Sequence, residues 1–213
     1  MQISVNKTNI KVENGKLIID IDSNVERLLG INDVVLSSIA PGRIIKGKTG
    51  REYIVFRHKE SGSTQILRKD LLEDNIVFDD NSNNFGTSSL LKYLNTIYIK
   101  EVEEDFGTEN IMEHETDLLS LDGLDDYGTI KSKVSLRTLD DYRYGRKNKI
   151  VTDDADLGRA QWLATPNSTP SGNGAHYVRY VSSSGGVRCR GCCWNYGMRP
   201  FFSLKSSIFV SCR

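Results

Sequence analysis

The stretch of sequence that decides the fold lies between two short motifs, QWLATP at residues 161–166 and YGMRPFF at residues 196–202. Two runs rich in β-branched and aromatic residues fall between them, AHYVRYV at 175–181 and GVRCRGCCWNY at 186–196. The residues that join these runs, 182–185, are only Ser and Gly. Strand-forming runs separated by such a turn are typical of a β-hairpin. We therefore expect a C-terminal hairpin that is held at both ends by the motifs.

Charge is distributed unevenly along the chain. The formal net charge is zero, because 28 Lys and Arg residues balance 28 Asp and Glu residues. Every charged side chain in residues 101–126 is nevertheless acidic, and every charged side chain after Asp156 is basic. We expect a polarised molecule with a cationic hairpin. The acidic stretch argues against the continuous basic footprint that nucleic acid needs, so no nucleic-acid partner is predicted.

Length and composition indicate one main globular domain with a small accessory segment. A chain of 213 residues can bury one large core. No apolar run approaches the roughly 18 residues that a membrane-spanning helix needs, so no membrane insertion is expected. The first residues lack the basic start and apolar centre of a signal peptide, which argues against ordinary secretion.

Residues 1–38 are predicted to form a small β-rich leader, and residues 39–213 the main domain. The pair Asn14-Gly15 lies between alternating apolar positions and favours a tight two-residue hairpin turn. A two-stranded unit of this size is only marginally stable alone. We therefore expect the leader to lean on a neighbour and to serve as an attachment segment.

The main domain carries both strand and helix signals, so the predicted fold class is α+β. Residues 44–68 indicate a meander of three strands, and residues 85–99 place apolar side chains at helical spacing behind a Ser/Thr cap. Residues 133–139 alternate like a strand and lead into a helix start at Thr138. The acidic stretch and residues 143–154 are expected to be polar loops.

No complete catalytic or metal-binding pattern is present in the sequence. Cys189 and Cys192 have CxxC spacing, but zinc needs a second well-spaced pair, and Cys193 and Cys212 do not supply one. The tripeptide at 113–115, Glu-His-Glu, is an incomplete fragment of a metal or acid–base site. We predict a non-enzymatic protein with no catalytic residue, no metal and no cofactor.

Five landmarks follow one another along the chain: Pro41-Gly42 with the strands after it, and then residues 88–95, 134–142, 162–166 and 197–200. Their order resembles that of an uncharacterised bacterial and phage domain family that is similar to the C-type-lectin and formylglycine-generating-enzyme (sulfatase-modifying factor) folds. The likeness covers roughly residues 39–210. The resemblance implies a C-type-lectin-like mixed domain with an exposed C-terminal hairpin.

The resemblance also assigns residue roles. It gives structural roles to Trp162, Pro166, Gly197, Arg199 and Pro200. The family usually has Trp-Leu-Arg-Ser/Thr-Pro and Gly-Val-Arg-Pro at the two motifs, so Ala164, Met198 and Phe201 depart from its pattern without disturbing the fold.

Two activities of similar folds are not expected here. The calcium-dependent sugar triplets of C-type lectins are missing, because Trp194-Asn195 is followed by Tyr196. Cys189 and Cys192 also lie outside the pattern of the formylglycine-generating enzymes. An enzyme of that type is therefore the least favoured alternative.

The leading hypothesis is a phage virion protein, attached to the tail, the baseplate or the capsid, whose hairpin binds a host-surface glycan or protein. It would be made in the bacterial cytoplasm, and residues 1–38 would contact other virion proteins. A purely structural decoration protein, with or without homo-oligomer formation, is the alternative. The predicted ligand-binding residues are Tyr177, Arg179, Tyr180, Arg188, Arg190, Trp194, Asn195 and Tyr196.

Strand alternation constrains how these side chains are displayed. We expect the candidate Tyr, Arg and Trp residues of the hairpin to form one accessible face, with the arginine-bearing side of each strand turned outward.

Composition leaves open whether the hairpin is a diversified segment. Lys, Glu, Gln, Met and Trp are all absent between Leu163 and Cys193. Mutagenesis of the adenines in an Asn codon does not produce these five residue types. Retroelements use such mutagenesis to vary display proteins. An ordinary Gly/Ser-rich hairpin is the slightly favoured explanation of residues 163–195.

Overall fold

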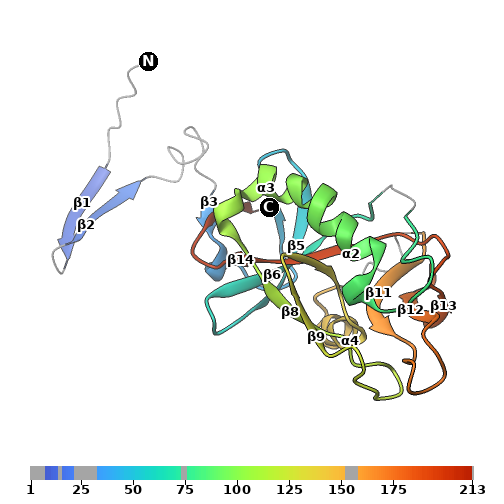
Figure 1. Cartoon of the computed structure of the whole chain (residues 1–213). Coiled ribbons are helices and arrows are strands. Elements are labelled where there is room, and N and C mark those ends of the chain that lie inside the picture. The colour runs from blue at the N-terminus through green and yellow to red at the C-terminus, as the bar shows by residue number, and fades with distance from the viewer. Residues whose placement is uncertain (1–7, 14–15, 22–32, 73–75, 152–157, 213) are drawn as a thin grey trace.

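The computed structural model describes residues 8–13, 16–21, 33–72, 76–151 and 158–212. Its centre is an antiparallel sheet of eight strands (Figure 1). In spatial order the strands are β10 (Val134–Leu136), β14 (Pro200–Lys205), β6 (Ser63–Arg68), β5 (Glu52–His58), β4 (Ile44–Lys46), β15 (Phe209–Cys212) and β3 (Asp33–Val35), while β7 (Ile111–Met112) also pairs with β14.

The predicted meander is confirmed, because β4, β5 and β6 pair in sequence order. The register sets Val134 opposite Phe202, Phe202 opposite Ile66, and Ile66 opposite Val55. All four side chains are fully buried. Directly opposed residues share one face of a sheet, so this row across four strands forms the centre of the core.

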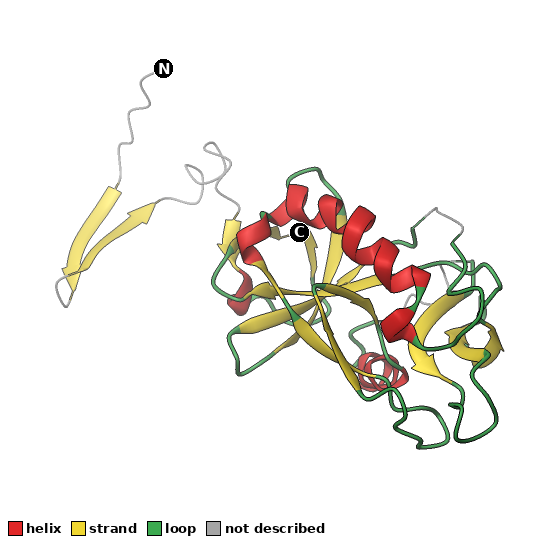
Figure 2. Cartoon of the chain, in the orientation of Figure 1, coloured by secondary structure: helices red, strands yellow, loops and turns green. Residues whose placement is uncertain are grey.

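A long helix covers that face of the sheet (Figure 2). It comprises α2 (Ser89–Tyr93), the π-helical turn η3 (Leu94–Tyr98) and α3 (Ile99–Phe106), and it follows the short 3-10 turn η2 (Phe85–Thr87). The predicted cap is confirmed, since the Leu91 amide donates to the Ser88 hydroxyl at 3.1 Å. Leu90 and Leu94 are buried, but Ile97 is 55% exposed because the π-helical turn shifts the helix face.

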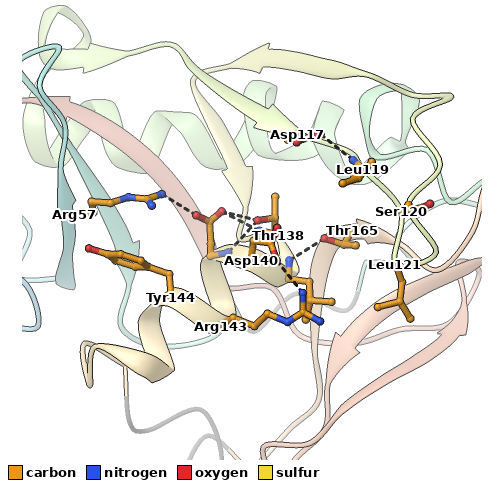
Figure 3. Close-up of a pocket in the computed structure, with 13 residues that line it drawn as sticks. Arg57, Asp117, Leu119, Ser120, Leu121, Thr138, Asp140, Arg143, Tyr144 and Thr165 are labelled. Carbon is orange, nitrogen blue, oxygen red and sulfur yellow. Dashed lines mark hydrogen bonds and ion pairs between the residues drawn. The ribbon is translucent and has the colours of Figure 1, made fainter.

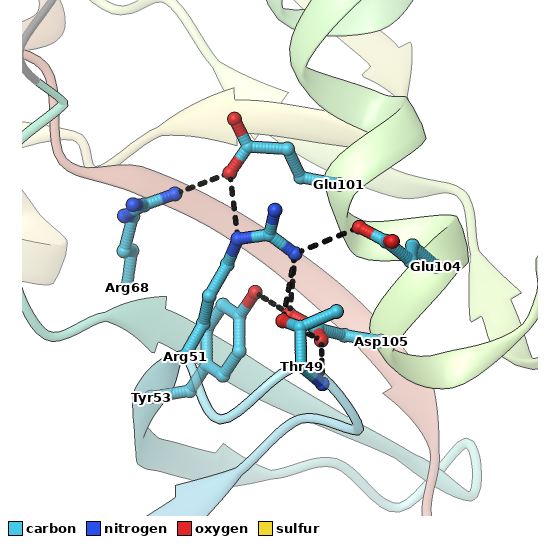
Figure 4. Close-up of polar contacts among 7 residues, drawn as sticks. All are labelled: Thr49, Arg51, Tyr53, Arg68, Glu101, Glu104 and Asp105. Carbon is cyan, nitrogen blue, oxygen red and sulfur yellow. Dashed lines mark hydrogen bonds and ion pairs between the residues drawn. The ribbon is translucent and has the colours of Figure 1, made fainter.

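The helix continues into the acidic stretch, where it is tied to the loop between β4 and β5 (Figure 4). Asp105 has no exposed side-chain surface and accepts hydrogen bonds from the Thr49 hydroxyl at 2.5 Å and the Tyr53 hydroxyl at 2.6 Å. Arg51 pairs with Asp105 at 3.4 Å and with Glu101 at 3.2 Å. These carboxylates are therefore structural, and the expectation of a solvated loop is wrong for this part of the stretch.

The rest of the acidic stretch also differs from the expected loop. A 3-10 turn, η4 (Thr108–Asn110), leads into β7, and β8 (His114–Asp117) then pairs with β9 (Thr129–Ser132). Strands contain 37% of the residues and helices contain 21%, so the fold is β-rich. The predicted α+β, C-type-lectin-like mixed class is therefore corrected. The physical reason is that segments without a clear local signal found strand partners far away in the sequence.

A second helix, α4 (Leu139–Lys147), packs against the opposite face of the sheet. Its predicted start is confirmed by a capping box between Thr138 and Asp141. The helix runs through the region expected to be a polar loop. Ile54, Phe56 and Phe201 form a second buried cluster with the segment that follows α4.

The leader is shorter than predicted. β1 (Thr8–Glu13) and β2 (Lys16–Ile21) pair with each other, with Glu13 opposite Lys16, as the hairpin prediction requires. Asn14 and Gly15 themselves lie outside the described residues. β3 joins the main sheet beside β15, and the 3-10 turn η1 (Leu36–Ser38) buries Leu36 completely. Residues 33–38 therefore belong to the main domain.

In the described part of the chain, no helix is both long enough and apolar enough to cross a membrane.

Candidate functional site

The two motifs that bracket the hairpin meet directly. The Trp162 amide donates to the Gly197 carbonyl at 3.0 Å, and the Gly197 amide donates to the Ala160 carbonyl at 2.8 Å. A Cβ on Gly197 would lie 2.9 Å from a methyl group of Leu71 and 3.1 Å from the Ala160 carbonyl. Gly197 is therefore needed for the close approach of the two chain segments.

The structure places all five predicted structural residues inside the protein. Trp162 is 1% exposed, and its ring centre lies 5.7 Å from that of Phe78. Arg199 is also 1% exposed, and its Nε donates to the Arg68 carbonyl at 2.8 Å. The other three residues, Pro166, Gly197 and Pro200, are buried as well.

The hairpin forms a three-stranded sheet of its own with the first motif. Its strands, in spatial order, are β11 (Gln161–Pro166), β12 (Tyr177–Val181) and β13 (Val187–Gly191). Figure 1 shows this sheet at the opposite end of the main domain from β3. α4 holds the hairpin turn, because the Tyr142 hydroxyl donates to the Gly185 carbonyl at 2.7 Å.

The strand register divides the predicted ligand-binding residues between two faces. Tyr180 lies opposite Arg188, and Val178 lies opposite Arg190, so both arginines share a face with Tyr180. Tyr177 and Arg179 alternate with these positions and lie on the other face. The expectation of one common face is therefore wrong, because the register puts the arginine-bearing sides of β12 and β13 on opposite faces. Alternation within each strand does not reveal which residues of the two strands are opposed.

Five of the predicted residues gather into one surface, which we call the aromatic–arginine surface. It consists of Tyr180, Arg188, Arg190, Trp194 and Tyr196. The rings of Tyr180 and Tyr196 are 4.5 Å apart between centres, and the Arg190 guanidinium lies 3.8 Å from the centre of the Trp194 ring. Trp194 is 50% exposed. The surface thus offers both aromatic faces and charged donors to solvent.

The aromatic–arginine surface is continuous with the core. The Trp162 ring lies 4.7 Å from the Tyr196 ring and 6.1 Å from the Tyr180 ring. Burial, followed by the hydrogen bond with Tyr180, raises the pKa of Tyr196, which keeps its hydroxyl protonated. In the described part of the chain, no carboxylate pairs with Arg188 or Arg190. Their charges are therefore available to a ligand.

The remaining predicted residues lie at the margins of this surface. Tyr177 is 53% exposed and meets Arg190 and Trp194 at a hollow of about 320 Å³ that also contains Asp80. The Arg179 guanidinium donates a hydrogen bond to the Asn167 side-chain oxygen at 2.9 Å, so this side chain is engaged within the protein. Asn195 is exposed, and its backbone forms a bridge with Val77.

Sequence reasoning missed the residues that hold the loop before β12. The Asn83 amide group donates to the Tyr177 carbonyl at 2.9 Å and to the Ser168 carbonyl at 2.8 Å. The Tyr127 hydroxyl donates to the Asn83 side-chain oxygen at 2.7 Å. No local signal marks Asn83, because it lies 94 positions before Tyr177.

Two acidic residues support the same loop from the other side. The Ser168 hydroxyl donates to Asp122 at 2.6 Å, and the Ser171 amide donates to Asp126 at 2.9 Å. Hydrogen bonds from Ser120 and then Ser168 lower the pKa of Asp122, and the Ser171 amide lowers the pKa of Asp126. Part of the acidic stretch is thus a support for the hairpin.

A larger hollow of about 520 Å³ lies between α4 and the acidic loop (Figure 3). Its polar groups are paired with one another. Arg57 pairs with Asp141 at 3.0 Å and stacks over the Tyr144 ring at 4.6 Å, and Arg143 pairs with Asp140 at 2.9 Å. Because these groups satisfy one another, we regard this hollow as a structural junction.

No metal site is seen among the residues that the structure describes, since no group of three His, Cys, Asp or Glu side chains is suitably placed. No disulfide joins any of the four cysteines, all of which lie in the described part of the chain. Cys189 and Cys193 are exposed, whereas Cys192 is buried, and burial raises the pKa of its thiol. The absence of a metal in the protein itself stays a prediction.

Comparison with protein families gives one finding. Residues 61–206 match a family described as a domain of unknown function, DUF6273. The matched region begins just before β6 and ends just after β14, so it contains the whole three-stranded sheet. No curated protein and no solved structure matches the chain.

Proposed function

The chain belongs to the DUF6273 family of domains of unknown function, and from that premise we propose that it is a non-enzymatic binding protein whose aromatic–arginine surface attaches to a glycan. The observation that carries this proposal is the cluster of Tyr180, Tyr196, Arg190 and Trp194. Aromatic faces stack on sugar rings, and a guanidinium group donates several hydrogen bonds in a fixed geometry. Such residues also dominate the energy of many binding surfaces.

The construction of the hairpin supports a binding role. Trp162 beneath the surface is almost fully buried, and the loop before β12 is held by Asn83. A surface whose side chains are held in place loses less conformational entropy when a ligand binds. The exposed end of the hairpin is therefore suited to recognition.

The biological setting that we propose is a phage virion, in which the hairpin attaches to the host surface. This setting rests on the resemblance of the landmark order to bacterial and phage domains. The β1–β2 hairpin would attach the protein to other virion proteins. A strand pair that is marginal alone gains stability when it packs on a partner.

The proposal is tested by the double variant Arg188→Ala/Arg190→Ala and by Trp194→Ala on an array of immobilised neutral, acidic and amino sugars. Because these side chains are exposed, we expect the free energy of unfolding to stay within about 1 kcal/mol of wild type. Binding to the recognised glycan should fall at least about tenfold, equivalent to about 1.4 kcal/mol. Phe209→Ala, which removes a 67% exposed aromatic side chain from β15, is the matched control and should bind normally.

A structural decoration protein is the second candidate, and one observation favours it. β13 is the outer strand of its sheet among the described strands, so one side of its backbone is open to pairing. A neighbouring virion protein or a second copy of the chain could extend the sheet there. If the double variant binds every glycan as wild type does but no longer assembles into particles, the structural role replaces the binding role.

A further inference from the structure

A polar recess interrupts the outer face of the main sheet, away from the hairpin. Ser203 lies directly opposite Gln65 in the register, so their side chains share a face, and both are almost fully buried. They line a hollow of about 510 Å³ together with Ser63 and His114. This hollow shares no residue with the aromatic–arginine surface.

Two buried polar atoms at this hollow have no hydrogen-bond partner in the described part of the chain. They are the hydroxyl oxygen of Ser203 and Nδ1 of His114. Ser203 is only 1% exposed. Buried polar groups in folded proteins are nearly always hydrogen-bonded, and leaving one unpaired is destabilising. Two such atoms on residues that line one hollow indicate that something else supplies their partners.

The contacts around His114 bear on which of its two ring nitrogens carries the proton. Nε2 lies 2.8 Å from the Ser135 hydroxyl oxygen. The same hydroxyl also lies 3.2 Å from the Leu136 carbonyl and 3.4 Å from the Phe201 carbonyl, and both carbonyls accept a hydrogen bond from it. When the hydroxyl hydrogen points to one of these carbonyls, the hydrogen between Ser135 and His114 belongs to Nε2. In that tautomer of the neutral ring, Nδ1 is a buried, unpaired hydrogen-bond acceptor on a residue that lines the hollow.

The charge state of His114 agrees with this assignment. Burial lowers the pKa of His114 to about 4, and the opposing effect of Asp141 is smaller. The imidazole is therefore neutral at pH 7.

The charged side chains at the edge of the hollow balance one another. Two lysines, Lys59 and Lys131, and two glutamates, Glu113 and Glu115, line the hollow, and Lys131 pairs with Glu115 at 3.5 Å. A site with this balance has no preference for an anion or a cation. The site also offers hydrogen-bond acceptors and donors, since Nδ1 of His114 accepts a hydrogen bond and the Ser203 hydroxyl can donate or accept one.

We propose that this hollow is a second ligand site and that it binds a neutral, hydroxyl-rich molecule, either a single sugar residue or a polyol. Each hydroxyl of such a ligand can donate to His114 Nδ1 or accept from Ser203, whereas a carboxylate or phosphate would place acceptor oxygens against the bare nitrogen. The volume lies within the range of small-molecule sites, which is about 300–1,000 Å³. The site does not depend on the function proposed for the hairpin.

The test is a titration of the full chain with D-glucose, N-acetylglucosamine and glycerol, followed by long-range proton–nitrogen NMR of the histidine rings. We expect at least one probe to shift the His114 Nδ1 resonance in a saturable way and to leave its Nε2–H in place. Ser203→Ala should weaken that binding about tenfold, as expected for the loss of one well-formed hydrogen bond. His114→Gln, which keeps a donor near Ser135 but removes Nδ1, should abolish it.

Ser132→Ala is the matched control. The Ser132 hydroxyl is also buried and unpaired among the described residues, and Ser132 lies directly opposite His114 in the register, but Ser132 lines a neighbouring hollow and not the proposed one. Binding by this variant should equal that of wild type. The proposal is overturned if no probe gives a saturable shift with folded wild-type protein, if acetate or phosphate shifts Nδ1 instead, or if Ser132→Ala weakens binding as much as Ser203→Ala does.

Discussion

Residue identity does not by itself fix a residue's role, as the two tryptophans show. Trp162 and Trp194 lie in one C-terminal segment and have equal helix and strand preferences, yet they are 1% and 50% exposed. Trp162 packs among Phe78, Tyr180 and Tyr196 beneath the hairpin. Trp194 instead lies at the surface under the Arg190 guanidinium. Trp162 should therefore contribute to stability, and Trp194 should contribute to binding.

Alanine substitutions at the two positions test this division. Trp162→Ala should lower the free energy of unfolding by about 3–5 kcal/mol, because it removes a buried aromatic side chain and leaves a cavity. Trp194→Ala should change it by no more than about 1 kcal/mol, because its side chain is half exposed. Urea unfolding followed by circular dichroism measures both. Equal effects of the two substitutions would contradict the placement of Trp162 in the core.

The four cysteines give a second test at this scale. Cys189 and Cys193 are exposed, whereas Cys192 between them in sequence is buried with a raised pKa. Because the thiolate is the reactive form, a maleimide reagent should label Cys189 and Cys193 quickly and Cys192 only on unfolding. Mass spectrometry of peptides from native protein after brief labelling identifies the sites. Rapid labelling of Cys192 would show that the hairpin end is open.

At the scale of elements, α3 is joined to the main sheet through one buried carboxylate. Asp105 accepts hydrogen bonds from Thr49 and Tyr53 and pairs with Arg51. A Cβ on Gly47 would overlap the Asp105 side chain, so glycine is required there. Burial alone would raise the pKa of Asp105, but the hydrogen bonds from Thr49 and Tyr53 and the charge of Arg51 lower it below its ordinary value.

The lowered pKa of Asp105 predicts a loss of stability in acid. The folded pKa is below the unfolded value of about 3.9, so the stabilisation by this group is fully present above that value. It is lost as the pH falls through the folded pKa. For the wild-type protein, we expect the urea concentration at the midpoint of unfolding to decrease below about pH 4. Asp105→Asn should be less stable than wild type at pH 7, and its midpoint should decrease less in acid. An unchanged acid profile in Asp105→Asn would show that other carboxylates, such as Asp79, cause the decrease.

For the whole molecule, the structure moves the boundary between the leader and the main domain. β1 and β2 pair only with each other among the described strands, whereas β3 pairs with β15 and Leu36 is buried in the main core. The proposed attachment segment is therefore residues 8–21 rather than all of residues 1–38.

Two truncations that differ by six residues test this boundary. Removal of residues 1–32 should leave the melting temperature within about 2 °C of the full chain, because no described core contact is lost. Removal of residues 1–38 also removes β3 and Leu36, whose burial contributes about 1.5–3 kcal/mol, and should lower the melting temperature by several degrees. Differential scanning calorimetry compares the three proteins. Equal melting temperatures for both truncations would return residues 33–38 to the leader.

The sequence alone determined the elements whose signals act over a few residues. The β4–β6 meander follows from alternation, the two helix starts from Ser88 and Thr138, and the β12–β13 hairpin from its Ser/Gly turn. These signals are local because a capping bond or a tight turn involves only neighbouring residues.

Only the tertiary structure decided the fold class and the geometry of the candidate sites. Register sets Tyr180 rather than Tyr177 beside the arginines, and Asn83 reaches Tyr177 from 94 positions away. The acidic stretch became helix and strands because Asp105 finds Tyr53 and Ile111 pairs with Leu204. Such contacts join residues that are distant in the chain, and their energies depend on burial and neighbours that no local pattern records.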